Sequence, residues 1–195
     1  MMSSDLMREG GWLASIAAGL LLVVGHVVNL GGHPEYGRVL GEILVLTAHL
    51  ALVFALVALY AAQAEQSGLL GALGMILSVV GTIIVCGVVL VEVAGASGVN
   101  VAGVLEAGVS GAISFVGGLA FLIGLIVFGI ATMRAGVFPR WGGLLLIVGD
   151  VVFGAGSFAG AAASIVSVVG AAITCAGFVW LGLRLWSTRQ PMRVR

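Results

Sequence analysis

Long apolar runs, separated by short polar or glycine-rich breaks, make up nearly the whole chain. The clearest breaks lie at 31–34, 63–68 and 134–141. A helix needs about 20 apolar residues to cross the hydrocarbon core of a bilayer. We therefore predict an all-α bundle of six transmembrane helices that forms one integral membrane domain over residues 1–195, with spans at about 12–30, 39–63, 69–94, 109–133, 141–158 and 162–186.

Two of the apolar runs admit another interpretation. The first run could be a signal peptide, but it exceeds the apolar segment of about 7–15 residues that such peptides have, so we expect a retained helix. Residues 142–186 are too many for a single span. We expect the chain to turn within the small residues of 154–163, which divides this run into the fifth and sixth helices.

The composition strengthens the membrane interpretation. Of the 195 residues, 61% are hydrophobic and 8% are charged, with a mean hydropathy of +1.26. Soluble domains have about 25% charged residues, so the solvent of this chain must be lipid. The net charge is zero and no basic run occurs, which argues against a nucleic-acid partner. All eight basic residues are arginine, and without lysine a retinal Schiff base cannot form.

The arginines predict an orientation. With six spans and a cytoplasmic N-terminus, the only arginine expected outside is Arg38. Cytoplasmic loops carry an excess of arginine and lysine, so we predict a multi-pass protein of the plasma membrane with both termini in the cytoplasm. The seven arginines expected inside are Arg8, Arg134, Arg140, Arg184, Arg189, Arg193 and Arg195.

A short internal similarity suggests a repeat. Residues 20–28 read LLLVVGHVV and residues 144–152 read LLLIVGDVV, so seven of the nine positions are identical. A weaker copy lies at 75–82. The three copies place His26, Thr82 and Asp150 at corresponding points, each directly after a glycine. Three related helical hairpins would bring these residues into one polar layer. Convergence in a chain this rich in leucine, valine and glycine is the alternative.

Ionisable residues within the predicted spans are the candidate functional groups. Burying such a group in a bilayer is costly, so it usually faces the interior of the bundle and has a partner. Asp150 is the clearest case, because it lies about nine residues into the fifth span. The whole candidate intramembrane polar site consists of His26, Asn29, Glu42, His49, Thr82, Glu92 and Asp150.

Three interpretations of this polar group remain open. It could form a path for protons or another cation, because histidine and carboxylate groups can exchange protons. His26 and His49 could instead bind a metal or a haem, although no H-E-x-x-H spacing is present. The third interpretation is structural, namely hydrogen bonds between helices that specify the packing. The polar residues of the first connection, His33, Glu35, Tyr36 and Arg38, together with Glu106, are expected in water.

No catalytic signature stands out, so the sequence favours a protein that is not an enzyme and predicts no cofactor. We expect a small carrier, channel or proton-coupled transport-type protein. One alternative is a non-catalytic subunit or scaffold of a larger membrane complex, and another is a haem- or metal-binding redox protein. The expected partners are the lipid bilayer and, for the scaffold alternative, other membrane subunits or a second copy of the chain.

Overall fold

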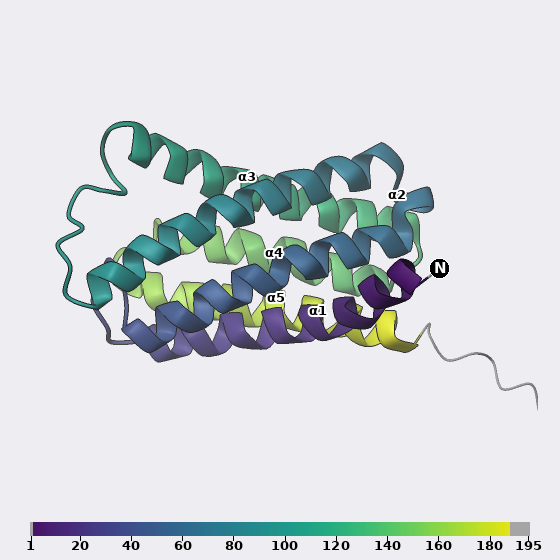
Figure 1. Cartoon of the computed structure of the whole chain (residues 1–195), viewed down its shortest axis with the longest axis horizontal. Coiled ribbons are helices and arrows are strands. Elements are labelled where there is room, and N and C mark those ends of the chain that lie inside the picture. Colours follow the sequence, from purple (N-terminus) through teal and green to yellow (C-terminus); the bar gives the residue numbers. More distant parts are fainter. Residues whose placement is uncertain (1, 188–195) are drawn as a thin grey trace, which may run out of the picture.

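The computed structural model describes residues 2–187, with side chains from Gly10 onward. This part of the chain is all helical, as predicted, and contains no strand. The arginines at 189, 193 and 195 and the side chain of Arg8, which entered the orientation argument, lie outside the described residues. The helices are α1 (Met2–Asn29), α2 (Val39–Ala96), α3 (Gly108–Ala135), α4 (Arg140–Gly156) and α5 (Ala163–Ser187), with a short 3-10 turn at Gly160–Ala162 (Figure 1).

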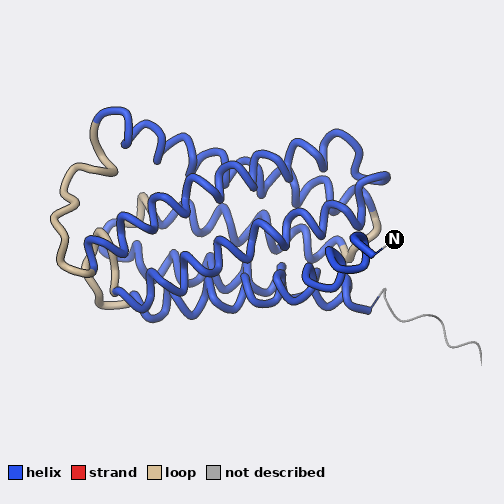
Figure 2. The backbone as a smooth tube through the Cα atoms, viewed as in Figure 1, coloured by secondary structure: helices blue, strands red, loops and turns tan. Residues whose placement is uncertain are grey.

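Helix α2 contains 58 residues in two arms, at the place where the sequence predicted two spans joined by a polar turn at 63–68. The helix continues through most of that turn, because the Gln63 side chain is buried and donates a hydrogen bond to Thr132 Oγ1 at 2.9 Å. Only Gly68 leaves the helical conformation, with φ 53° and ψ −145°. There the chain reverses, so that an N-terminal arm (39–67) and a C-terminal arm (69–96) run in opposite directions (Figures 1 and 2).

The reversal at Gly68 makes a testable prediction. Its backbone conformation is open to glycine and strained for other residues. We expect Gly68→Ala to destabilise the protein by about 1–3 kcal/mol, measured as a lower thermal unfolding temperature in detergent. Gly87→Ala is the matched control, because Gly87 is helical and a Cβ there meets no atom within 4 Å. Equal unfolding temperatures for the two variants would contradict the assignment of the reversal to Gly68.

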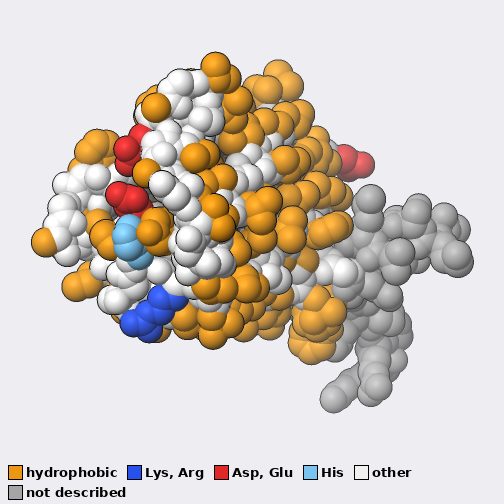
Figure 3. All heavy atoms as spheres, turned by 60° about the vertical axis from the view of Figure 1, so that its left-hand side comes forward, with side chains coloured by type: hydrophobic (Ala, Val, Ile, Leu, Met, Phe, Trp, Pro, Cys, Tyr) orange, Lys and Arg blue, Asp and Glu red, His pale blue; other side chains and the backbone are white. Residues whose placement is uncertain are grey.

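Several helices are suited to a membrane. Four segments are long and apolar enough to cross one, namely Gly10–Asn29, Val39–Ala96, Gly108–Ala135 and Gly160–Ser187. Helix α4, at 17 residues, is shorter. The flank of the bundle is largely hydrophobic, whereas charged and histidine side chains gather at one end (Figure 3). Large apolar side chains such as Leu69 and Val109 are exposed. Such a surface fits lipid and not water.

The helices form a closed ring around a central axis. In order around the ring, α1 packs on α2, α2 on α3, α3 on α4, α4 on α5, and α5 again on α1. Connections 30–38 and 97–107 lie together at one end, here named the loop end. The Gly68 reversal and the 136–139 turn lie at the other, the turn end, where the described chain also begins and finishes (Figure 1).

The hydrophobic core fills the half of the bundle near the turn end. Its members come from all five helices and from the 136–139 turn. They include Leu56, Leu125, Phe128, Leu146 and Phe178, which have no measurable exposure. Large side chains therefore close the central axis on this side. The half near the loop end contains a smaller apolar cluster and leaves space along the axis.

Three glycines allow close packing at corresponding places. A Cβ at Gly25 would collide with the N-terminal arm of α2, one at Gly81 with α3, and one at Gly149 with α5. Each glycine thus packs against the helical segment that follows it in the chain. This is the packing that three related hairpins would share, and the repeat itself stays a prediction.

Candidate functional site

A cavity of about 550 Å³ lies along the axis in the half of the bundle near the loop end. Four of the five long helices contribute to its wall. Six of the seven residues of the predicted polar site line it, namely His26 and Asn29 from α1, Glu42 and His49 from the N-terminal arm of α2, Glu92 from its C-terminal arm, and Asp150 from α4. Residues 124 positions apart in sequence, such as His26 and Asp150, therefore share one space.

Thr82 is the seventh predicted residue, and the structure does not bring it to the cavity. Its side chain is fully buried, and its hydroxyl has no hydrogen-bond partner among the described residues. Gly81 beside it packs against the Phe121 backbone, which holds this stretch of α2 close to α3. Of the polar layer that the internal similarity predicted, only His26 and Asp150 line the cavity.

Asn29 joins the last turn of α1 to the first turn of α2. Its Nδ2 donates a hydrogen bond to Glu42 Oε1 at 2.6 Å, and its Oδ1 accepts one from the Arg38 backbone N–H at 2.9 Å. This arrangement depends on Gly41, where a Cβ would collide with the Asn29 amide. The connection between the two helices therefore sets the position of the Glu42 carboxyl group.

Glu42 and Glu92 form a pair of acids at the top of the cavity. Their side chains lie close enough across the two arms of α2 to interact with each other. Two carboxyl groups that meet in a buried place favour a state in which one of them carries a proton. The pair could therefore hold a proton, or a cation in the proton's place.

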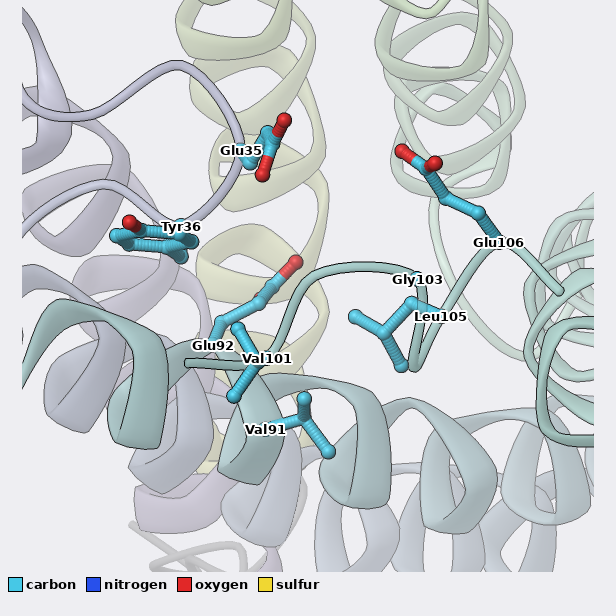
Figure 4. Close-up of a pocket in the computed structure, with 8 residues that line it drawn as sticks. All are labelled: Glu35, Tyr36, Val91, Glu92, Val101, Gly103, Leu105 and Glu106. Carbon is cyan, nitrogen blue, oxygen red and sulfur yellow. The ribbon is translucent and has the colours of Figure 1, made fainter. Parts of the chain in front are cut away.

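Above this pair, at the loop end, a smaller hollow of about 160 Å³ forms a mouth. Glu35, Glu92 and Glu106 line it together with Tyr36, and their carboxyl groups face the same opening (Figure 4). The Tyr36 ring stacks on His33 with centroids 3.8 Å apart. Glu92 lines both the mouth and the cavity, so it lies between the two spaces. Clustered carboxylates at a mouth attract cations and repel anions.

The two histidines face the cavity from neighbouring helices. Val45 O lies 2.8 Å from His49 Nδ1, so this nitrogen carries the hydrogen when the ring is neutral. The His26 ring packs on Phe153, with centroids 5.0 Å apart, and its Nε2 has no hydrogen-bond partner within residues 10–187. The two imidazoles are close enough for their charges to interact. Both can therefore exchange a proton with the contents of the cavity.

Asp150 is the deepest acid of the site. Its side chain is 2% exposed, and in the described part of the chain Oδ2 has no hydrogen-bond partner. Gly149 before it packs closely on Thr174 of α5, which turns the aspartate toward the cavity. No arginine is among the described residues that line the cavity, so Asp150 faces no fixed positive charge other than a protonated histidine.

Aromatic residues form a part of the wall that the sequence analysis did not single out. Phe115 and Phe121 come from α3, Phe153 from α4, and Phe158 from the segment that follows α4. In the sequence, phenylalanine within apolar spans is the ordinary filling of a bundle and carries no signal of a site. Glu35 and Glu106, which were expected only to face water, are exposed and also line the mouth.

The metal interpretation can be compared with the arrangement of the described side chains. No group of three or more histidine, cysteine, aspartate or glutamate side chains within them is arranged to hold a metal ion. Comparison with known proteins does not decide the function either, because no family model, curated protein or solved structure matches the chain. The interpretation of the site therefore depends on its own residues.

Proposed function

We propose that the protein is a small proton-coupled carrier that spans the membrane six times, with the loop end outside. The two arms of α2 count as separate spans, because the chain reverses at Gly68 and each arm exceeds the roughly 20 residues that the hydrocarbon core requires. Arg134 and Arg140 lie at the turn end, and the acids of the mouth lie at the loop end. The positive-inside rule then puts the turn end in the cytoplasm.

The observation that carries the proposal is the cavity that gathers ionisable residues from α1, from both arms of α2 and from α4. It shares Glu92 with the mouth at the loop end, and the closed core lies toward the turn end. A site that is accessible from one side and closed toward the other is what a carrier has in one of its alternating states. A channel would need a continuous path, and Leu56, Phe128 and Phe178 occupy the axis where that path would run.

Proton coupling follows from the chemistry of the wall. Glu42 and Glu92 lie close together at the top of the cavity, where two buried acids favour sharing one proton, and His26, His49 and Asp150 lie deeper in the same cavity. Chains of acids and histidines at membrane depth are typical of proton relays. Among the described residues, these five are the titratable groups facing the cavity.

The test is a pH jump applied to proteoliposomes on a solid support, where the movement of protons into the site produces a transient current. We expect Asp150→Asn to reduce this current to less than about a tenth, because an amide cannot bind or release the proton. Glu65→Gln is the matched control, since Glu65 is exposed near the Gly68 reversal and outside the cavity. Its current should equal that of the parent protein.

Two outcomes would overturn the proposal. One is a parent protein whose current does not exceed that of protein-free liposomes. The other is an Asp150→Asn variant that is folded, as shown by its helical circular dichroism, and retains the full current. The first result would favour the scaffold alternative, in which the polar groups specify packing only.

A further inference from the structure

The size of the cavity indicates what it holds. A volume of about 550 Å³ lies within the range of about 300–1,000 Å³ that is usual for small-molecule sites. A water molecule takes up only about 30 Å³ in the liquid, so a proton, hydronium ion or single metal ion would leave most of the space empty. The cavity has the dimensions of a site for an organic molecule.

The wall of the cavity combines an apolar surface with acids. Four phenylalanines and several valines form most of it, and the charged groups among its described residues are acidic or histidine. Asp150 contributes a buried carboxyl group with an unpartnered oxygen. An apolar body with a positive charge complements such a wall, because the faces of aromatic rings and the carboxylate both attract cations.

The cavity also opens sideways toward the lipid, between α3 and α4. Near the turn end these helices pack tightly, so that a Cβ at Gly129 would lie 2.8 Å from Gly143 O. They remain in contact at the last turn of α4, where a Cβ at Gly154 would lie 2.5 Å from the Leu122 side chain. Beyond this contact, toward the loop end, they diverge, and a Cβ at Gly118 would meet no atom within 4 Å (Figure 1). Two lining residues on either side of this gap, Phe115 and Phe158, are 72% and 92% exposed. A ligand dissolved in the lipid could enter here without crossing the acidic mouth.

The geometry points to a hydrophobic organic cation as the ligand of this cavity, entering from the outer leaflet between α3 and α4 and pairing with Asp150. This inference rests on the proposed carrier function and names its substrate class. It differs from the proton site alone, since the aromatic wall and the lateral opening would have no role in moving a proton.

The experiment uses two probes of nearly the same shape and opposite charge, tetraphenylphosphonium and tetraphenylborate, with the full chain in lipid nanodiscs. We expect saturable binding of tetraphenylphosphonium to one site per chain and no competition by tetraphenylborate. Asp150→Asn should weaken binding of the cation by at least about tenfold, which corresponds to about 1.4 kcal/mol. Glu65→Gln should leave the affinity unchanged, and Gly118→Leu, which places a side chain in the opening, should slow association.

Three results would overturn the inference. They are uptake equal to that of empty nanodiscs, equal competition by the anion, or cation binding that Asp150→Asn does not change. Competition by the anion would indicate that the cavity accepts any apolar guest, such as a lipid acyl chain. The pH-jump current separates this failure from failure of the carrier proposal, because a protein that binds no organic cation but moves protons through Asp150 retains the proposed function.

Discussion

Replacing Gly81 by leucine is expected to leave little folded protein. A Cβ at this position would lie 2.6 Å from the Cα of Phe121, so the obstacle is backbone and cannot rotate away. Gly74 and Gly124 make equally close approaches along the same contact between the C-terminal arm of α2 and α3. A leucine would have to push the two helices apart over its whole length. We expect a cost above about 3 kcal/mol, the upper part of the usual range for overpacking.

The measurement is the yield of monodisperse protein and its unfolding temperature in detergent. Gly87→Leu is the matched control, because it makes the same change in the same arm at an exposed position where a Cβ meets nothing within 4 Å. We expect the control to behave as the parent protein does. If Gly81→Leu were equally monodisperse and stable, this result would contradict the close packing of α2 on α3. It would also contradict the position of the cavity wall that these two helices form.

Much of the fold could be predicted from the sequence, because lipid imposes simple rules. Apolar runs of about 20 residues become helices, since backbone groups in a bilayer must bond within their own segment. The α2 reversal was harder to predict. The polar residues at 63–67 resemble a loop, yet the hydrogen bond from Gln63 to Thr132 keeps them helical, and one glycine makes the turn. A partner 69 positions away in the chain is not visible in local sequence.

The candidate site, like the fold, could be predicted from the sequence only in part. Acids and histidines within spans could be singled out because burying them is costly, and six of the seven predicted residues line one cavity. Thr82 was included only through the internal similarity, and a hydroxyl can be buried at much lower cost, so its presence in a span says little about a site. The lateral opening depends on how α3 and α4 diverge from their contact at Gly129 and Gly143. A crossing angle of this kind is a property of the packed bundle.

Reversing the charge of Glu92 is expected to have the largest effect on the proposed ligand. Glu92 lines both the mouth and the cavity and lies close to Glu42. An arginine there would pair with ionised Glu42, so the net charge of the pair would rise by one unit, from a proton-sharing pair of acids to a neutral ion pair. At an effective dielectric constant of about 20 and a separation of about 8 Å, one unit charge is worth about 2 kcal/mol. We expect Glu92→Arg to weaken tetraphenylphosphonium binding by about 30-fold, since about 1.4 kcal/mol is tenfold.

Glu106→Arg is the control that makes this result interpretable. It is the same substitution in the same mouth, but Glu106 is exposed and does not line the cavity (Figure 4). Because charges in water are screened, we expect its effect on affinity to stay below about threefold, and lateral entry predicts an unchanged association rate as well. A large loss of rate with Glu106→Arg would show that the cation enters through the acidic mouth. Equal loss of affinity in both variants would place the bound cation in the mouth itself, outside the membrane-embedded cavity.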